Sequence, residues 1–312
     1  MIARCYFQNK TYLSRNVSSL LNCRTILKRA KHQSSITNRD QVFIDNSNSK
    51  SDSLPNQNND ATNYFGFKPV TDEEKFEKVY NVFHNVAGKY DLMNDAMSFG
   101  IHHYWRNELI KKLDPIPGTR LLDVAGGTGD VAFEFLRYTN ERNDRESSVI
   151  VCDFSENMLK IGQQRAIKFG FHPDRCQWMI GDAMNLPFDS DSFDAYTISF
   201  GIRNVVNVDR AIQEAFRVLK PGGMFLCLEF SSQVNNPLLK SIYDWYSFEI
   251  IPVMGEILLN DWQSYQYLVE SIRKFPDQQT FKLMIEKNGF ILVDYDNFLS
   301  GITSIHYGFK PL

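Results

Sequence analysis

Residues 126–129, Gly-Gly-Thr-Gly, have the types and spacing of a ligand-binding turn. They follow a branched-aliphatic run at 120–125, typical of a buried parallel strand, and precede a helix expected at 131–138. Glycines let the backbone approach a ligand closely, and amide groups at a helix start form an electropositive cradle. The turn is therefore predicted to hold a carboxylate, a phosphate or a ribose.

Two classes of ligand use such a turn. Gly127-x-Gly129-x-x-Ala132 satisfies the loose dinucleotide fingerprint, which alone is a weak signal. The adenosyl group of S-adenosylmethionine is the other candidate. A turn that binds nothing is the third reading, but three glycines in four positions would lose chain entropy without a gain in packing.

The elements that position this turn alternate regularly between strands and helices. This alternation predicts a doubly wound α/β sheet, whose ligands lie beyond the carboxyl ends of the strands. Strands are expected at 120–125, 149–153, 176–181, 193–200, 224–230, 291–297 and 304–309. Helices are expected at 131–138, 156–169, 208–219 and 278–288, and a surface loop at 139–148.

Polar side chains stand at the carboxyl ends of these strands, so they can be assembled around the turn. They are Asp123, Asp153, Asp182 with Ala183, Ser199 and Glu229. An acid at the end of the second strand, here Asp153, accepts both ribose hydroxyls of an adenosine, in a dinucleotide or in S-adenosylmethionine.

Two helices are expected before the sheet. Thr71 and Glu74 form a capping box at the start of the first, and the second covers 100–113. The helical period is lost at 90–98, which predicts a polar, Met-rich break that forms one wall of a site. His102 and His103 are interpreted as helix-start residues, because no partner at metal-ligand spacing is evident.

Residues 232–275 interrupt the alternation with aromatic and aliphatic side chains, broken into helical pieces by Pro252 and Gly255. An insertion after a strand's carboxyl end is placed to act as a lid. An apolar lid favours an apolar substrate, and the alternative is extra core packed on a neighbouring helix.

The N-terminal segment differs in charge from the rest of the chain. Residues 1–39 contain eight Lys or Arg and no acid, the composition of a mitochondrial transit peptide, with a disordered basic tail as the alternative. Residues 40–70 are expected to be a disordered linker, and 71–312 a single catalytic domain. Residues 40–312 contain 26 basic and 37 acidic side chains, and this negative balance disfavours nucleic-acid binding.

The five cysteines fall at no metal-ligand spacing, and the three beyond the leader are expected to be reduced and buried. The sequence has no apolar run long enough to span a bilayer.

Several motifs together resemble one family. They are VAGGTGD, GDA followed by LPF, TISFGIRNV, RVLKPGG, LEFS, NDWQSYQYLVESIRKFPDQQTF and KYDLMNDAMSFGIHHYWR. The sequence is similar to class I S-adenosylmethionine-dependent methyltransferases, and more closely to the ubiquinone/menaquinone biosynthesis C-methyltransferase family, from about residue 79 to 309. The resemblance implies a mostly parallel seven-stranded sheet with N-terminal helices and a helical lid.

The resemblance also implies a site. Its cofactor contacts are expected at Gly126, Gly127, Thr128, Gly129, Asp153, Asp182, Ala183 and Ser199. The implied reaction moves a methyl group from S-adenosylmethionine to a ring carbon of a polyprenyl benzoquinol in coenzyme Q synthesis, without a metal. The resemblance also implies a peripheral position on the matrix side of the mitochondrial inner membrane. Other proteins of a coenzyme Q complex are implied as partners, and a homodimer is also expected.

Such a reaction needs a stabilised phenolate and an acceptor for the ring proton. Arg203 and Asn204 follow the fourth strand and are well placed for substrate oxygens, with Tyr90 as a further catalytic candidate. The acceptor is left open among Glu229, His306 and water. Two other functions remain, an NAD-dependent oxidoreductase on the same fold and a structural member of a biosynthetic assembly.

Overall fold

A computed structural model describes residues 63–86, 88 and 90–312; the expected leader and residues 40–62 of the expected linker lie outside it. A seven-stranded sheet with the order β5-β4-β3-β6-β7-β9-β8 forms its centre. Strand β9 pairs antiparallel with β7 and with β8, and the other neighbouring pairs are parallel. The strands are β3 (Arg120–Val124), β4 (Ser148–Asp153), β5 (Cys176–Ile180), β6 (Phe193–Ser199), β7 (Leu219–Phe230), β8 (Ile291–Phe298) and β9 (Thr303–Phe309). The expected doubly wound, mostly parallel sheet is confirmed.

Helices cover both faces of this sheet, which explains why its strands are apolar on both sides. Leu121 faces one core cluster and Leu122 the other, as period-2 alternation requires. On the first face lie α4 (Ile101–Leu113), α5 (Asp130–Glu141) and α6 (Glu156–Lys168); on the second lie α7 (Val208–Val218) and α11 (Gln278–Lys287). The cysteines at 152, 176 and 227 are buried and reduced, as expected.

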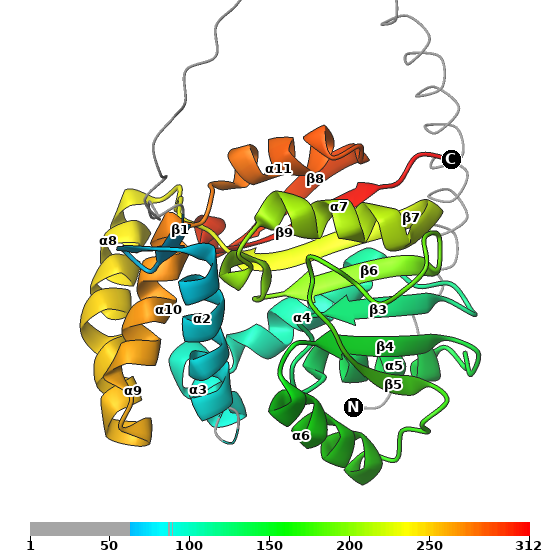
Figure 1. Cartoon of the computed structure of the whole chain (residues 1–312), viewed down its shortest axis with the longest axis horizontal. Helices are drawn as coiled ribbons and strands as arrows, with labels where there is room; N and C mark the ends of the chain where they lie inside the picture. Colours follow the sequence, from blue (N-terminus) through cyan, green and yellow to red (C-terminus); the bar gives the residue numbers. More distant parts are fainter. Residues whose placement is uncertain (1–62, 87, 89) are drawn as a thin grey trace, which may run out of the picture. The chain divides into compact units, whose positions relative to one another are not determined.

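The insertion after β7 is helical, as expected. It consists of α8 (Pro237–Trp245), the π-helical turn η3 (Tyr246–Ile250), α9 (Ile251–Leu259) and α10 (Trp262–Lys274). These helices gather with α2 and α3 at one end of the sheet (Figure 1). Tyr265 and Tyr267 are buried, which confirms that some of its aromatics form extra core, whereas Trp245 is exposed; the role as a lid stays a prediction.

Helix α2 (Asp72–Val86) begins at the expected capping box: Thr71 Oγ1 accepts from the Glu74 amide, and the Glu74 carboxylate accepts from the Thr71 amide. The expectation of a break at 90–98 was wrong, since α3 (Tyr90–Ser98) is a helix. Met93 is buried in a cluster with Ile251 and Val269. The apolar stripe of α3 consists of few residues, so its period is weak in the sequence.

Structure begins earlier than expected. Strands β1 (Asn63–Phe65) and β2 (Lys68–Val70) form a hairpin inside the segment assigned to the linker. The Phe65 ring stacks on Tyr267 of α10 at 4.0 Å between centroids. Tertiary contacts therefore order a hairpin that is too short to be stable alone.

The loop expected at 139–148 is shorter than predicted. Helix α5 continues to Glu141, and Ser147 is fully buried. Arg175 donates to Ser147 O, Asn140 Oδ1 and Thr139 Oγ1, which fixes this connection against the body of the domain. Two short turns, η2 (Ile202–Asn204) and η4 (Leu299–Gly301), follow β6 and β8. Within the described ranges, every helix is too short or too polar to cross a bilayer.

Packing of α9 on α10 gives a test of the lid. A Cβ at Gly255 would lie 2.2 Å from Cδ2 of Tyr265, so only glycine allows the two helices this approach. We expect Gly255→Val to lower the free energy of unfolding by about 1–3 kcal/mol through overpacking. Ile257→Val, at a residue of α9 that is 76% exposed, should change it by less than about 0.5 kcal/mol. Urea denaturation followed by circular dichroism measures both, and equal midpoints would contradict the packing argument.

Candidate active site

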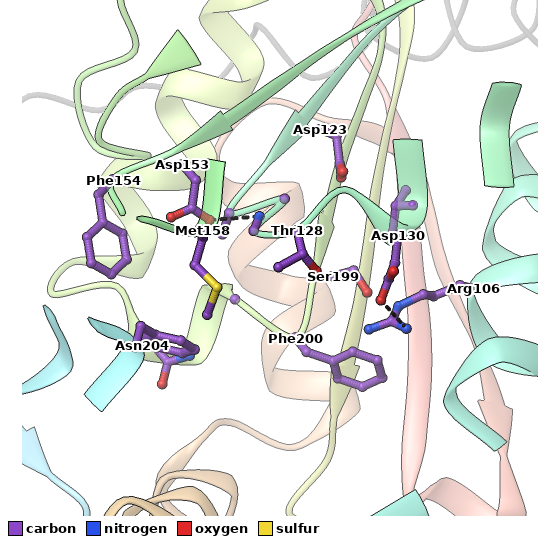
Figure 2. A pocket seen from close by; sticks show the side chains of 16 residues that line it. Arg106, Asp123, Thr128, Asp130, Asp153, Phe154, Met158, Ser199, Phe200 and Asn204 are labelled. Atoms are coloured by element: carbon purple, nitrogen blue, oxygen red, sulfur yellow. Dashed lines mark hydrogen bonds and ion pairs between the residues drawn. The ribbon is translucent and has the colours of Figure 1, made fainter. Parts of the chain in front are cut away.

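The Gly-rich turn after β3 borders a cavity of about 620 Å³ at the carboxyl ends of the strands (Figure 2). Its backbone requires glycine at Gly127, where φ is +53°, and at Gly126, where a Cβ would lie 2.7 Å from Asp123 Oδ2. Gly129 also has positive φ but packs against Trp178, outside the cavity lining. The structure thus gives Gly129 a packing role, and the ligand contact expected there stays a prediction.

The amides of this turn are mostly committed within the protein. Gly126 N donates to Cys152 O, Gly127 N to Asp153 Oδ2 at 2.9 Å, and Gly129 N to Gly126 O. The amides of these three glycines are therefore not open to an anion. The turn instead positions the Asp153 carboxylate.

Asp153 lies at the end of β4 and is buried at the cavity wall, where it was expected. Its two oxygens accept from the amides of Gly127 and Ser155. Burial raises the pKa of Asp153 to about 6, although both amide bonds oppose the rise. Each carboxylate oxygen keeps a lone pair, so Asp153 can accept two hydroxyl groups of a ribose.

Three buried polar atoms in the lining of this cavity have no partner among the described residues. They are Asp123 Oδ2, Ser199 Oγ and Asn204 Nδ2. Asp123 Oδ1 accepts from Thr197 Oγ1 at 2.8 Å, and burial raises the pKa of Asp123 to about 7. Buried polar groups without partners are costly, so their gathering in one cavity points to a polar ligand.

An ion network joins the turn to the surrounding helices. Asp130, the first residue of α5, accepts from Arg106 of α4 at 2.8 Å and from Arg165 of α6 at 2.7 Å. Burial would raise the pKa of Asp130, but the two guanidinium groups hold it below its usual value. Arg165 also donates to Thr128 Oγ1 and O, which fixes the turn itself.

Asp182 and Ala183 line an adjoining cavity rather than the first one. The two cavities share Ala125, Phe154 and Asn204 in their walls. Asp182 Oδ1 accepts from the Met184 amide, which fixes the carboxylate at the end of β5. An elongated ligand can therefore extend from the turn to Asp182.

A larger cavity of about 1120 Å³, including its part open to solvent, lies between the helical insertion, α3, α4 and the ends of β6 and β7. Apolar side chains dominate its lining: Met97, Phe99, Ile101, Trp105, Phe230, Leu239, Ile242, Tyr246, Ile251, Leu268, Ile272, Leu299 and Ile302. Arg106 and Phe200 line both this cavity and the one beside the turn. These two residues form the partition across which two ligands would meet.

Arg203 lines the apolar cavity, and its side chain is held on three sides. Nη1 donates to Phe200 O at 2.6 Å and pairs with Glu229 at 2.8 Å, and Nε donates to Ser271 Oγ at 3.3 Å. Nη2 is thus the nitrogen that, within the described part of the chain, can donate to a ligand. Burial raises the pKa of Glu229, and Arg203 opposes that rise.

The remaining candidates are distributed differently. Asn204 lines the cavity beside the turn, and its Oδ1 accepts from Tyr267 at 2.9 Å. It is outside the lining of the large apolar cavity, but it lines a third, smaller cavity together with Arg203. Tyr90 begins α3, but its side chain lies outside the described residues. His306 is buried against Gln278 O, away from all the cavities described above. It is removed as a proton acceptor.

Sequence reasoning missed several lining residues. Phe154 follows Asp153 directly, so its position was a usable signal. Phe200 follows Ser199 and Asp130 follows Gly129, so the same signal was available for them. Arg106 had no such neighbour, because its place at the site depends on how α4 packs against the turn.

The strand order, with one reversed strand next to the edge, and an acid at the end of β4 define the class I methyltransferase fold, and the chain is an S-adenosylmethionine-dependent methyltransferase. Residues 35–310 match the model of the ubiE/COQ5 methyltransferase family, and the chain belongs to it. This membership decides between the two cofactor classes in favour of S-adenosylmethionine.

Relatives cover most of the chain. The mitochondrial 2-methoxy-6-polyprenyl-1,4-benzoquinol methylases of Rattus norvegicus and Homo sapiens are each 53% identical, covering 83% and 80% of this chain and 87% and 85% of their own. The protein of that name from Danio rerio is 49% identical and covers 95% of both chains. A possible histamine N-methyltransferase from Thermotoga maritima matches in structure (TM-score 0.51, 18% identity, 74% of this chain and 99% of that one), which shows the fold alone.

Removing the Asp153 carboxylate tests the cofactor side of the site. We expect Asp153→Ala to weaken binding of S-adenosylhomocysteine by about 2–4 kcal/mol, because two charge-assisted hydrogen bonds to the ribose are lost. Asp174→Ala, at an exposed position with a side chain 86% accessible, is the matched control and should leave the Kd unchanged. Titration calorimetry measures the Kd of both variants. An unchanged Kd in Asp153→Ala would show that this carboxylate does not bind the ribose.

Proposed function

We propose that the protein transfers a methyl group from S-adenosylmethionine to a ring carbon of 2-methoxy-6-polyprenyl-1,4-benzoquinol in ubiquinone biosynthesis. The observation that carries the proposal is the pair of adjoining cavities, one polar and one apolar, with Arg106 and Phe200 shared between them. The names of the relatives from rat, human and zebrafish support the same substrate.

The polar cavities fit the adenosyl donor. Asp153 would accept the ribose hydroxyls, and Asp182 with Ala183 would contact the adenine. Asp123, Ser199 and Asn204 supply buried polar atoms that such a ligand can satisfy. S-adenosylmethionine brings an electrophilic methyl group on a sulfonium, so this side of the site needs binding and alignment rather than a base.

The apolar cavity fits a quinol ring with the start of a polyprenyl tail. Arg203 Nη2 would hold the substrate oxygen next to the attacking carbon and stabilise it as a phenolate. A guanidinium stays protonated, so Arg203 does not act as the base. A carbon–carbon bond forms as the carbon–sulfur bond breaks, and the ring proton then leaves to water.

Glu229 is assigned a positioning role instead of the proton acceptance considered for it. Its Oε1 accepts from Arg203 Nη1 and from the Phe230 amide, and it is outside the lining of the apolar cavity. The carboxylate therefore acts by orienting Arg203. Tyr90 and Asn204 remain predictions as contacts of substrate oxygens.

A methyl-transfer assay tests this function. The purified enzyme is given labelled S-adenosylmethionine and a short-tailed 2-methoxy-6-prenyl benzoquinol, and the product is identified by NMR. We expect the label on a ring carbon. Methylation of an oxygen would contradict the proposed reaction while leaving the methyltransferase class intact.

The same assay tests Arg203. We expect Arg203→Gln combined with Glu229→Gln to lower turnover by about a hundredfold, because the charged donor to the phenolate is lost. The double substitution is needed because Arg203 removed alone leaves Glu229 buried and unpaired, which costs about 3–5 kcal/mol of stability. Glu229→Gln alone also leaves a buried charge unpaired, so its turnover is compared per folded molecule. It keeps the guanidinium and should lose much less turnover on that basis. Near-normal turnover of a folded double variant would show that Arg203 does not stabilise the phenolate, and Asn204 or Tyr90 would then be the contact.

We further propose a peripheral position on the matrix side of the mitochondrial inner membrane. Residues 1–39 have the composition of a transit peptide, and the relatives are named mitochondrial. Leu238, Ile242 and Trp245 lie at i, i+4 and i+7 on α8, are 72%, 53% and 60% exposed, and adjoin the apolar cavity, which Ile242 lines. A bilayer surface is the occupant that suits this face, because the proposed substrate carries a lipid tail. Partner proteins of a coenzyme Q complex and a homodimer stay predictions.

Fractionation of mitochondria separates the two parts of this proposal. A chain starting at residue 40 should stay outside the organelle, since it lacks the basic leader. Leu238→Ser with Trp245→Ser should be imported but released from membranes into the soluble matrix fraction. Ile167→Ser, at a residue of α6 that is 76% exposed, is the matched control and should behave as wild type. Import of the shortened chain would show that the targeting signal lies outside residues 1–39. Membrane retention of the double variant would exclude the α8 face as the membrane-binding surface.

A further inference from the structure

Three side chains that commonly bind metals meet at the junction of α3 and α4. Asp95 Oδ1 lies 2.9 Å from His103 Nε2 and 3.6 Å from His102 Nε2, and all three ligand atoms lie within 4.8 Å of one another. The chain reverses between the helices at Phe99 and Gly100, both of which have positive φ. This turn brings together residues whose separation in sequence matches no metal motif, so the spacing of the sequence did not reveal Asp95 as a neighbour of the two histidines.

The hydrogen bonds of Ser98 determine the tautomer of His102. Ser98 Oγ lies 2.6 Å from Asn94 O and 2.6 Å from His102 Nδ1. A carbonyl oxygen cannot donate, so the single hydroxyl hydrogen of Ser98 is used on Asn94 O. Nδ1 must then carry a hydrogen and donate to Ser98, which leaves the lone pair of His102 on Nε2.

That lone pair points at a carboxylate oxygen. Two acceptors 3.6 Å apart repel each other unless a cation lies between them or the ring is protonated. A neutral imidazole beside a carboxylate is the form in which both groups ligate a metal.

We propose that Asp95 Oδ1, His102 Nε2 and His103 Nε2 bind a zinc ion, with water at the remaining position. Zinc favours imidazole and carboxylate donors in a tetrahedron, where bonds of about 2.0 Å place ligand atoms about 3.3 Å apart. The distances of 2.9 and 3.6 Å from Asp95 Oδ1 lie on either side of that value. Ser98, bonded to the far nitrogen of His102, is the outer partner that metal-binding histidines usually have.

The ion would link α3 to α4 beside the apolar cavity. Asn94, Ser98 and His102 line that cavity, so the site fixes the position of one of its walls. The side chains of His103 and Asp95 are 64% and 54% exposed, which leaves a path for the ion and for its water. The role is structural, so the inference does not depend on the identity of the methyl acceptor.

Calorimetry with Zn²⁺ on the full chain tests the site, with Co²⁺ as a second probe whose visible absorption reports tetrahedral coordination. We expect one strongly bound ion per wild-type chain, lost in His103→Ala and in Asp95→Ala. Ser98→Ala should bind about 10–100-fold more weakly, because the outer hydrogen bond is removed. Melting curves without metal verify that each variant is folded.

His172→Ala is the matched control, since His172 lies 3.1 Å from Asp174 in another exposed His and Asp pair. It should bind zinc as tightly as wild type. If His103→Ala binds zinc as tightly as wild type, the proposed site is excluded. Equal weakening in His172→Ala and His103→Ala would identify adventitious surface binding only.

Discussion

The ion pairs of Asp130 with Arg106 and Arg165 are the interaction on which the arrangement of the site depends. They join α4 and the first turn of α5 to α6, and Arg165 extends the network to Thr128 of the Gly-rich turn. Both pairs are largely buried, so removing one member would leave a desolvated charge. The same Arg106 that anchors the turn also lines both cavities. One charge network therefore fixes the Gly-rich turn and borders both cavities.

A second buried ion pair, Arg203 with Glu229, lies on the substrate side of the partition. The side chains of these two residues are only 6% and 1% exposed, so water does little to screen them. Bonds to Phe200 O and Ser271 fix the guanidinium further. A donor already held in place needs no rearrangement as charge develops on a substrate oxygen, which is the main physical advantage of an enclosed site.

The sequence was sufficient for features that depend on local chain chemistry. A buried strand, glycines in a turn and an acid ending the next strand predicted β3, β4 and Asp153 correctly. It was not sufficient where long-range packing decides. Helix α3 is stabilised by Met93 against Ile251 and Val269, and hairpin β1–β2 by stacking on Tyr267. Asp95 reaches His102 and His103 only because of the turn between two helices, and the packing of Gly129 against Trp178 joins residues that are distant in sequence.

The charge balance of the polar cavity explains why a Gly-rich turn that resembles a dinucleotide fingerprint favours a different ligand. In a dinucleotide site the turn amides are directed at a pyrophosphate. Here the amides of Gly126, Gly127 and Gly129 are used within the protein. Asp123, Asp130 and Asp153 line the same cavity. Asp130 is paired with Arg106 and Arg165, so the Asp153 carboxylate, which accepts only from backbone amides, is the main uncompensated charge of this wall. An anionic pyrophosphate would meet repulsion there, whereas a sulfonium cation is attracted to such a wall.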